Sequence, residues 1–381
     1  MLYFFNSSTS GAISLPFCSN APDWKGLKYP TFNPLFSKAK QSPTDTKVFP
    51  IFVSQPVMNN DLFFSMVKLY NEGKKMKTKE ELLKLYNLPL NELLAEAKKY
   101  TFKEFEFCSL ISARTGKCSQ NCKYCSQSTH YNTEIFTHPL VSVEEVSKVA
   151  RESKENGAVN FAIVTSGKTP DEAKDFNELL KMIKEINSHG LKSCASIGIC
   201  SPELALQLKE AGLNRFHHNI NTCESYHSEI CTTHTYQDRI DTCKNIKNAG
   251  IELCCGVIIG MGEAVEQRIE MALELAQIAP DSIPVNILTP IKGTPFENYF
   301  DKIDEENIIR TICVFKIANP NSSIRLAGGK KARLSEENIQ LLIENCVDSA
   351  IVGNYLTTTG FSPDNDKEKV NKAGKILKKS L

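Results

Sequence analysis

The sequence predicts an α/β protein whose main part is a (β/α)8 barrel of the TIM type. After residue 104, short apolar runs alternate with helical segments, and several of these segments end in glycine. Eight strand–helix units in about 250 residues is the length typical of such a closed barrel. An open doubly wound sheet is the alternative, but no Gly-x-Gly-x-x-Gly run follows the first strand. The strands are expected at 104–112, 159–167, 191–198, 214–222, 251–260, 281–289, 322–329 and 348–356.

Helices are expected between these strands and on both sides of the barrel. Four of the barrel helices should stop at a glycine, namely Gly157, Gly190, Gly212 and Gly250. Residues 58–103 should form helices, the first from about residue 61 and the second after a Thr78/Glu81 capping signal, with Pro89 dividing the second pattern. The barrel domain is expected over 104–360, and residues 361–381 should form a C-terminal helix.

Residues 1–57 differ in composition from the rest of the chain. They are rich in Ser, Pro, Phe and Asn, and Asp23 and Asp45 are their only acidic residues. Because they show no sustained helical or strand period, we expect a disordered extension. An organelle-targeting segment and a stretch upstream of a true start at Met58 are alternatives, although the absence of Arg argues against targeting.

Composition excludes some partners. The net charge is +1 over 381 residues, so no global field favours nucleic acid. No stretch approaches about 18 consecutive apolar residues, so no membrane-spanning helix is expected. The 14 cysteines are spread along a long chain without a convincing secretory signal. They therefore indicate reduced thiols and metal ligands in a reducing compartment, and we expect a cytoplasmic location.

Three cysteines carry the strongest functional signal. Cys118, Cys122 and Cys125 have the spacing C-x3-C-x2-C in the run GKCSQNCKYCSQS. Four cysteines would close a zinc site or saturate an iron–sulfur cluster, whereas three leave one iron open to a small molecule. A zinc site with a remote fourth ligand and a chance grouping are the alternatives. The run follows the first strand, at the barrel face where active sites lie.

A second set of residues lies on the barrel strands themselves. Cys108, Cys194, Cys254 and Arg325 fall on the first, third, fifth and seventh strands. Alternate strands contribute the side chains of one interior layer, so these four would hold a second iron–sulfur cluster if they point inward. An arginine on a barrel strand favours this interpretation, because a buried guanidinium needs an anion or another ligand as its partner. The alternative is that the three cysteines are inert residues of the apolar core, as buried cysteines often are. Cys231, after the fourth strand, is a rival ligand.

Polar side chains at the strand ends suit a polar ligand. A dense group of them follows the fourth strand and Asn286 ends the sixth, although a merely polar loop is the alternative for the group. Tyr124, inside the cysteine loop, is expected to stack on a planar ring, and Arg239 to pair with a carboxylate of the substrate or of a neighbouring element. The fourth-strand group consists of His217, His218, Asn219 and Asn221.

Together these runs resemble the radical S-adenosylmethionine superfamily and, within it, the biotin synthase family. The cysteine triplet is shared by the whole superfamily, and later runs narrow the assignment across residues 62–380: HHNINT, TTHTYQDRIDT, GVIIGMGE, PVNILTPIKGTP and SIRLAGG. The resemblance implies an enzyme that inserts sulfur into dethiobiotin to make biotin. A 5′-deoxyadenosyl radical from S-adenosylmethionine would start the reaction.

The resemblance also implies roles for individual residues. The triplet would hold a 4Fe-4S cluster that chelates the methionine part of S-adenosylmethionine, and an auxiliary cluster would donate the sulfur. Better-known members hold a 2Fe-2S auxiliary cluster with three cysteines and an arginine. Cys194, Cys254 and Arg325 match this pattern, but the second-strand cysteine is replaced by Ala162, and Cys108 matches a variant with a first-strand cysteine. Contacts to adenosine are implied for Tyr124 and Asn221, and contacts to dethiobiotin for Asn219 and Asn286.

The implied partners are dethiobiotin, a flavodoxin or ferredoxin as electron donor, the iron–sulfur assembly machinery and a second copy of the chain in a homodimer. Two alternatives share the motifs. A related radical enzyme of the hydrogenase-maturation or methylornithine-forming type would not insert sulfur. A non-catalytic iron–sulfur or zinc module would not cleave S-adenosylmethionine.

Overall fold

The computed structural model describes residues 76–170, 173–353 and 363–380. The predicted extension over 1–57 and the helix expected from about residue 61 lie outside the described residues.

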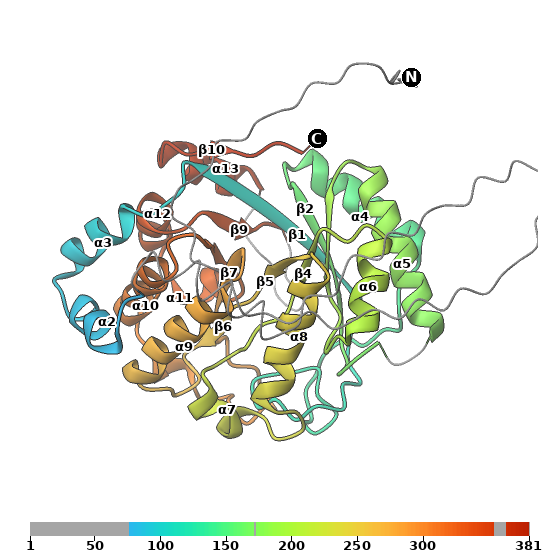
Figure 1. Ribbon diagram of the computed structural model, residues 1–381, viewed down its shortest axis with the longest axis horizontal. Helices are drawn as coiled ribbons and strands as arrows, with labels where there is room; N and C mark the ends of the chain where they lie inside the picture. Colours follow the sequence, from blue (N-terminus) through green and yellow to red (C-terminus); the bar gives the residue numbers. More distant parts are fainter. Residues whose placement is uncertain (1–75, 171–172, 354–362, 381) are drawn as a thin grey trace, which may run out of the picture. The chain divides into compact units, whose positions relative to one another are not determined.

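Eight strand positions close into a parallel barrel (Figure 1). The order is β1-β2-β3-β4-β5-β7-β8-β9, and β9 pairs back with β1. β6 continues the fifth position and also pairs with β7. The predicted fold class is therefore confirmed. The strands are β1 (Glu104–Arg114), β2 (Asn160–Thr165), β3 (Lys192–Ser196), β4 (Arg215–His217), β5 (Glu252–Cys254), β6 (Val257–Ile259), β7 (Ser282–Ile287), β8 (Ser323–Leu326) and β9 (Ser349–Ile351).

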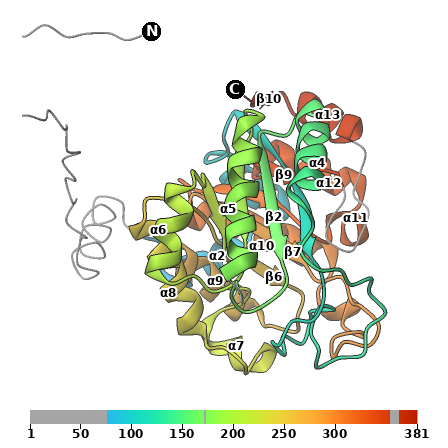
Figure 2. The ribbon, with the colours of Figure 1, turned by 90° about the vertical axis from the view of Figure 1, so that its right-hand side faces the viewer.

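Helices follow the strands and surround the barrel (Figures 1 and 2). The main ones are α4 (Val143–Glu155), α5 (Ala173–Ser188), α6 (Pro202–Glu210), α8 (Tyr236–Asn248), α9 (Val265–Ile278), α10 (Glu305–Ala318), α12 (Glu336–Asn345) and α13 (Pro363–Lys372). Short helices α7 (Glu224–Ile230), η1 (Phe300–Lys302) and α11 (Lys330–Arg333) lie in the connections. The four predicted helix-ending glycines all have positive φ. No helix within the described ranges is long and apolar enough to cross a bilayer.

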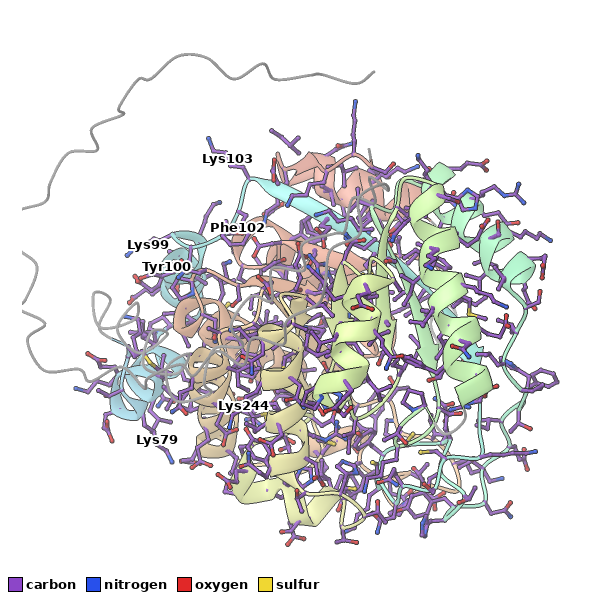
Figure 3. All side chains as sticks on the ribbon, turned by 45° about the vertical axis from the view of Figure 1, so that its right-hand side comes forward. Lys79, Lys99, Tyr100, Phe102, Lys103 and Lys244 are labelled. Carbon is purple, nitrogen blue, oxygen red and sulfur yellow. The ribbon has the colours of Figure 1, made fainter. Side chains whose placement is uncertain are left out.

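In the part of the chain that the structure describes, two helices precede the barrel, α2 (Lys79–Tyr86) and α3 (Leu90–Lys98), and they pack against α9, α10 and α12. The predicted capping box is confirmed, because the Thr78 side chain accepts from the Glu81 N–H while Glu81 accepts from the Thr78 N–H. Pro89 is the N-cap of α3, as expected for a residue that divides the pattern. Lys79, labelled in Figure 3, forms an ion pair of 2.8 Å with Glu270 of α9.

The helix predicted over 361–381 does not extend through the described part of this segment, residues 363–380. The helix α13 ends at Lys372, and a two-residue strand, β10 (Ile376–Leu377), pairs in parallel with the start of β1. A strand of two residues is too short to show a period of two, so the sequence pattern could not reveal it.

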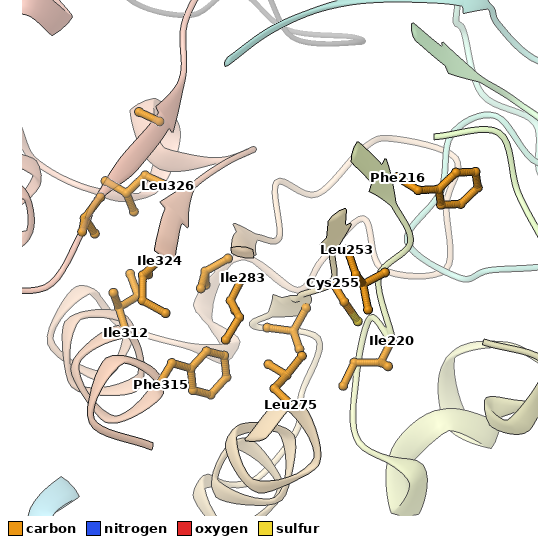
Figure 4. Close-up of a cluster of buried hydrophobic side chains, with 14 of the residues drawn as sticks. Phe216, Ile220, Leu253, Cys255, Leu275, Ile283, Ile312, Phe315, Ile324 and Leu326 are labelled. Carbon is orange, nitrogen blue, oxygen red and sulfur yellow. The ribbon is translucent and has the colours of Figure 1, made fainter. Parts of the chain in front are cut away.

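Alternation along each strand separates the apolar core from the barrel interior. Leu253 of β5 and Ile324 of β8 face outward, where Leu275 of α9 and Phe315 of α10 belong to the same buried cluster (Figure 4). Burying one such side chain contributes about 1.5 to 3 kcal/mol. Since neighbouring residues of a strand point to opposite faces, the residues that follow Leu253 and Ile324 point into the barrel. Those residues are Cys254 and Arg325.

The fifth strand is interrupted, whereas one strand over 251–260 was predicted. Between β5 and β6, a Cβ atom on Gly256 would lie 1.9 Å from the carbonyl oxygen of Pro284. Only glycine permits this close approach of two backbones. The interruption leaves Cys254 inside the barrel and places Cys255 in the outer core, 3.7 Å from Cys243.

Candidate functional site

The three cysteines of the C-x3-C-x2-C run lie in a loop that follows β1 and closes on itself. The Cys118 N–H donates to the Gln127 carbonyl at 3.0 Å, and the Thr129 N–H donates back to the Cys118 carbonyl at 2.9 Å. A tight turn brings the Cys125 N–H to the Cys122 carbonyl at 3.0 Å. The loop therefore wraps round the space that the three thiols share.

The thiols open into a cavity of about 270 Å³, here called the upper pocket, at the carboxyl ends of β2, β3 and β4. Its wall includes Thr165 and Ser196 from the ends of β2 and β3, and among the described residues that line it there is no Asp or Glu. The structure thus brings the predicted triplet and most of the predicted polar rim to one cavity. The predicted residues in this wall are Cys118, Cys122, Cys125, Tyr124, His217, His218, Asn219, Asn221 and Arg239.

Asn221 joins Tyr124 to Arg239 at the wall. Its carboxamide lies 2.7 Å from the Tyr124 hydroxyl and 2.9 Å from the Arg239 guanidinium, so the amide oxygen is assigned to the side of these two donors. Asn221 has a φ of +68°, a left-handed conformation that asparagine tolerates better than most residues. Burial raises the pKa of Tyr124 well above its usual range, so the hydroxyl remains a donor.

Arg239 has no carboxylate partner in the described part of the protein. Its guanidinium donates to the Asn219 carbonyl at 2.9 Å and to Nε2 of His234 at 2.6 Å. No carboxylate of a neighbouring described element pairs with it, because α8 directs this side chain into a wall that contains no Asp or Glu among the described residues. A carboxylate on a bound molecule stays a prediction.

Cys231 lies beside the upper pocket and not with the second set of cysteines. With Cys122 and His234 it forms a buried group whose possible ligand atoms lie within 4.8 Å of one another, so its role as a metal ligand stays a prediction. Its Sγ is 3.7 Å from Sγ of Cys122 and 3.2 Å from Nδ1 of His234. The loop after α7 crosses over the cysteine loop, where the Lys123 N–H donates to the Ile230 carbonyl at 2.9 Å. The hydrogen bond from Cys122 lowers the pKa of Cys231 to about 2 and raises that of Cys122.

His234 is a residue of the site that was not predicted from the sequence. It accepts from Arg239 at Nε2, so its proton is assigned to Nδ1, which contacts Oε1 of Gln120 at 2.9 Å. The available signal was its place in the run TTHTY, one residue before the capping threonine of α8.

A second group, here called the lower layer, consists of Cys108, Cys194, Cys254 and Arg325, and each is at most 2% exposed. Nη1 of Arg325 donates to Sγ of Cys254 at 3.6 Å. The neighbouring Cys194 thiol lowers the pKa of Cys108 to about 7, whereas burial raises the pKa of Cys194 well above its usual range. The four side chains that the strand count placed together do meet inside the barrel.

Glu106 holds the arginine of the lower layer in place. It was also not predicted from the sequence. Its Oε1 accepts from Nη1 of Arg215 at 2.7 Å and from Nη2 of Arg325 at 3.0 Å. Burial alone would raise the pKa of Glu106, but the two guanidinium groups lower it to about 2. Its position two residues before Cys108, on the same face of β1, was the signal that could have identified it.

Residues 112–276 match the Radical SAM superfamily, and residues 284–376 match the Biotin and Thiamin Synthesis associated domain. The biotin synthase of Acetivibrio thermocellus is 42% identical, covering 82% of this chain and 99% of the relative. The chain belongs to the biotin synthase family. The biotin synthase of Clostridium tetani is 41% identical over 77% of this chain and 90% of its own length.

Solved structures share the barrel of this biotin synthase family member. Methylornithine synthase superposes with a TM-score of 0.69 at 17% identity, covering 82% of this chain and 98% of the other. The FeFe-hydrogenase maturase of Carboxydothermus hydrogenoformans gives a TM-score of 0.67 at 16% identity, with 83% and 79% coverage. At these identities the likeness concerns the fold.

Ala162 stands in the lower layer of this family member without a donor atom. It pairs in register with Cys194 and lies in one buried cluster with Cys108 and Cys194. The thiols of the layer therefore come from β1, β3 and β5, and β2 contributes only a methyl group.

Asn286 is not in the wall of the upper pocket. Its Nδ2 donates to the Val257 carbonyl at 3.1 Å and its Oδ1 accepts from the Gly328 N–H at 3.0 Å. The side chain thus joins β7 to the strands on both sides, and its contact with a ligand stays a prediction.

Proposed function

We propose that this chain converts dethiobiotin to biotin by placing two iron–sulfur clusters at two levels of one barrel. Cys118, Cys122 and Cys125 would hold a 4Fe-4S cluster and S-adenosylmethionine in the upper pocket. The lower layer would hold an auxiliary cluster, of the 2Fe-2S type or a variant of it, that donates the sulfur. The observation that carries the proposal is the presence of two separate sets of three cysteines, one lining an open cavity and one buried beneath it.

The donor set of the upper pocket fits such a cluster. Three cysteines of one short loop supply three thiolates and leave one iron for a small molecule. Nε2 of His217 and Nε2 of His218 are buried without a hydrogen-bond partner among the described residues. Buried polar atoms are normally paired, so these two nitrogens support a polar ligand in the pocket.

The side chains of the pocket would bind and orient rather than transfer protons. Arg239, in a wall whose described residues include no Asp or Glu, would attract the carboxylate of S-adenosylmethionine. Tyr124 and Asn221 would contact its adenosine part, while Asn219 and Asn286 would contact dethiobiotin. When bound, the cluster and S-adenosylmethionine supply the carbon-centred radical chemistry that acid–base side chains cannot perform.

The lower layer fits a buried cluster because its donors are preorganised. Glu106 fixes Arg325 at 3.0 Å, and Arg325 in turn reaches Cys254 at 3.6 Å. A guanidinium is stable in the barrel interior only with anionic partners, and thiolates beside it would be such partners. Ala162 leaves the usual second-strand ligand absent, so Cys108 would take its place as a ligand from β1.

The proposed reaction also needs partner proteins and a reducing cellular location. Flavodoxin or ferredoxin would supply electrons, the iron–sulfur assembly machinery would load the clusters, and two copies would form a homodimer. A cytoplasmic location would keep the thiols reduced.

Anaerobic turnover tests the proposal. The reconstituted chain, given dethiobiotin, S-adenosylmethionine and a reductant, should yield biotin and 5′-deoxyadenosine, both measured by mass spectrometry. An iron content clearly above about four per chain supports two clusters. Deoxyadenosine without biotin, with about four irons, would point to a radical enzyme that does not insert sulfur. No cleavage of S-adenosylmethionine would point to a non-catalytic module.

A further inference from the structure

A second cavity opens at the end of the barrel opposite the cysteine loop. It has a volume of about 500 Å³ and is here called the lower mouth. Residues at the amino ends of the strands line it, among them Lys103 before β1, Ser323 at the start of β8 and Asp348 before β9. Figure 3 shows Phe102 and Lys103 at the beginning of β1. The barrel therefore has an opening at each end.

The inner end of the lower mouth reaches the lower layer. Glu106 and Arg215 line the cavity, and each is less than 10% exposed. Glu106 contacts Nη2 of Arg325 at 3.0 Å, and Nη1 of the same guanidinium contacts Sγ of Cys254 at 3.6 Å. A single layer of side chains thus separates this cavity from the buried thiols.

Of the four acidic residues that line the lower mouth, three pair with cations and the fourth, Asp281, accepts from the Leu253 N–H. Asp348 lies 2.8 Å from Nζ of Lys316 and 3.4 Å from Nζ of Lys375. Glu106 faces two guanidinium groups, at 2.7 and 3.0 Å. A small anion would therefore meet little net repulsion on its way inward, and it would meet the positive charge of Arg215 at the end.

Arg215 connects the surface with the interior. Besides Glu106, its guanidinium binds Glu252 at 2.8 Å, and the Glu252 side chain is 40% exposed. A guanidinium held between an exposed and a buried carboxylate can shift between them without losing its charge partner.

We propose that the lower mouth is the access route by which hydrosulfide reaches the lower layer, with the Glu106–Arg215 pair as its gate. The inference rests on the proposed function, in which each reaction removes sulfur from the lower cluster. The upper pocket would then hold S-adenosylmethionine, so a separate opening allows sulfur to be replaced from the other end. The step is a movement of hydrosulfide alone; no bond forms at the gate and no electrons are transferred there.

Blocking the lower mouth tests this route. Ser323 lines the cavity two residues before Arg325, on the same face of β8, and Ser323→Phe should narrow it. After the lower cluster has been removed by a chelator or by turnover, ferrous ion and sulfide are added anaerobically. The return of cluster absorption and of iron per chain should be several-fold slower in Ser323→Phe. The matched variant Ser323→Ala should rebuild at the normal rate.

A second measurement needs no variant and remains decisive if Ser323→Phe does not fold. Filling the upper pocket with S-adenosylhomocysteine should leave the rate of rebuilding unchanged. Equal rates in Ser323→Phe and Ser323→Ala, or rebuilding that S-adenosylhomocysteine slows, would overturn the route. These readouts do not depend on catalysis. A first turnover that yields no biotin would instead overturn the proposed function.

Discussion

Nη1 of Arg325 lies 3.6 Å from Sγ of Cys254, and Oε1 of Glu106 lies 3.0 Å from the other terminal nitrogen of the same guanidinium. The arginine is 1% exposed, so both contacts are made away from water. Because a buried charge needs a partner, Glu106 stabilises Arg325 in the position from which it faces the thiol. The Arg325 guanidinium and the Cys254 thiol are therefore already in position in the barrel interior before any ligand binds there.

Glu106→Gln should destabilise the cluster-free protein by about 3 to 5 kcal/mol, because two buried guanidinium groups lose their shared carboxylate. Chemical unfolding monitored by circular dichroism measures the change. Glu104→Gln is the matched control on the same strand. Its carboxylate is 63% exposed and pairs with Lys378 at 3.3 Å, so its loss should cost less than about 1 kcal/mol. Equal effects of the two variants would contradict the buried network.

The contribution of Glu106 should depend on pH. Its pKa in the folded protein is about 2, below the ordinary value of 4.5, so the stability it adds is fully present above pH 4.5. That stability, about 3 kcal/mol, is lost as the pH falls from 4.5 towards 2. The free-energy difference between the wild type and Glu106→Gln should therefore shrink over this range. A difference independent of pH would show that Glu106 is not ionised against the arginines.

Cys122→Ala and Cys254→Ala should fail at different steps. Cys122→Ala removes a thiolate of the upper cluster, and 5′-deoxyadenosine formation should be abolished. Cys254→Ala should spare that cleavage and stop biotin formation, because only the lower layer is altered. Chromatography with mass spectrometry measures both products in the same reaction. Biotin formed by Cys254→Ala would contradict the assignment of the sulfur donor.

Arg239→Gln should weaken the binding of S-adenosylmethionine by about 10- to 100-fold, as expected for the loss of a charge-assisted hydrogen bond of about 1.5 to 3 kcal/mol. Equilibrium binding to the anaerobically reconstituted protein measures the affinity. Lys123→Gln, a change of the same charge within the cysteine loop at a residue outside the wall of the upper pocket, is the control. Unchanged affinity in Arg239→Gln would exclude the proposed contact with the carboxylate.

Ala162→Cys should add a fourth thiol to the lower layer, since Ala162 pairs with Cys194 and packs against Cys108. The absorption and Mössbauer spectra of the lower cluster should change, while those of the upper cluster should not. Ala162→Ser is the control of similar size with a weaker metal ligand. Identical spectra in the wild type and Ala162→Cys would show that this position does not face the cluster.

The sequence predicted the barrel because eight strand–helix units and their glycine stops are regular over a long stretch. The sequence also predicted that four side chains share one layer of the barrel interior, because alternate strands contribute to the same layer and the strands can be counted. These are Cys108, Cys194, Cys254 and Arg325. The break in the fifth strand was not visible, because it depends on the approach of Gly256 to Pro284 on the neighbouring strand β7. The strand β10 has only two residues, which is too few for an alternating pattern to be recognised in the sequence.

The missed side chains depend on loop paths and on partners distant in sequence. Cys231 was predicted as a rival ligand because its place after the fourth strand was known, whereas the course of that loop was not. The role of Glu106 depends on its ion pairs with Arg215 and Arg325, which lie 109 and 219 residues away in the sequence. Among the described residues, Arg239 donates to a carbonyl and an imidazole and not to a carboxylate, which residue types alone do not reveal.

One isotope measurement tests the central claim most directly. The protein is reconstituted with 34S-sulfide so that its clusters carry the label, and a single anaerobic turnover with dethiobiotin is analysed by mass spectrometry. Biotin containing 34S, formed by the wild type and absent from Cys254→Ala, is the predicted result. Deoxyadenosine formation accompanied by no biotin, or by biotin without the label, would contradict a sulfur-donating cluster in the lower layer.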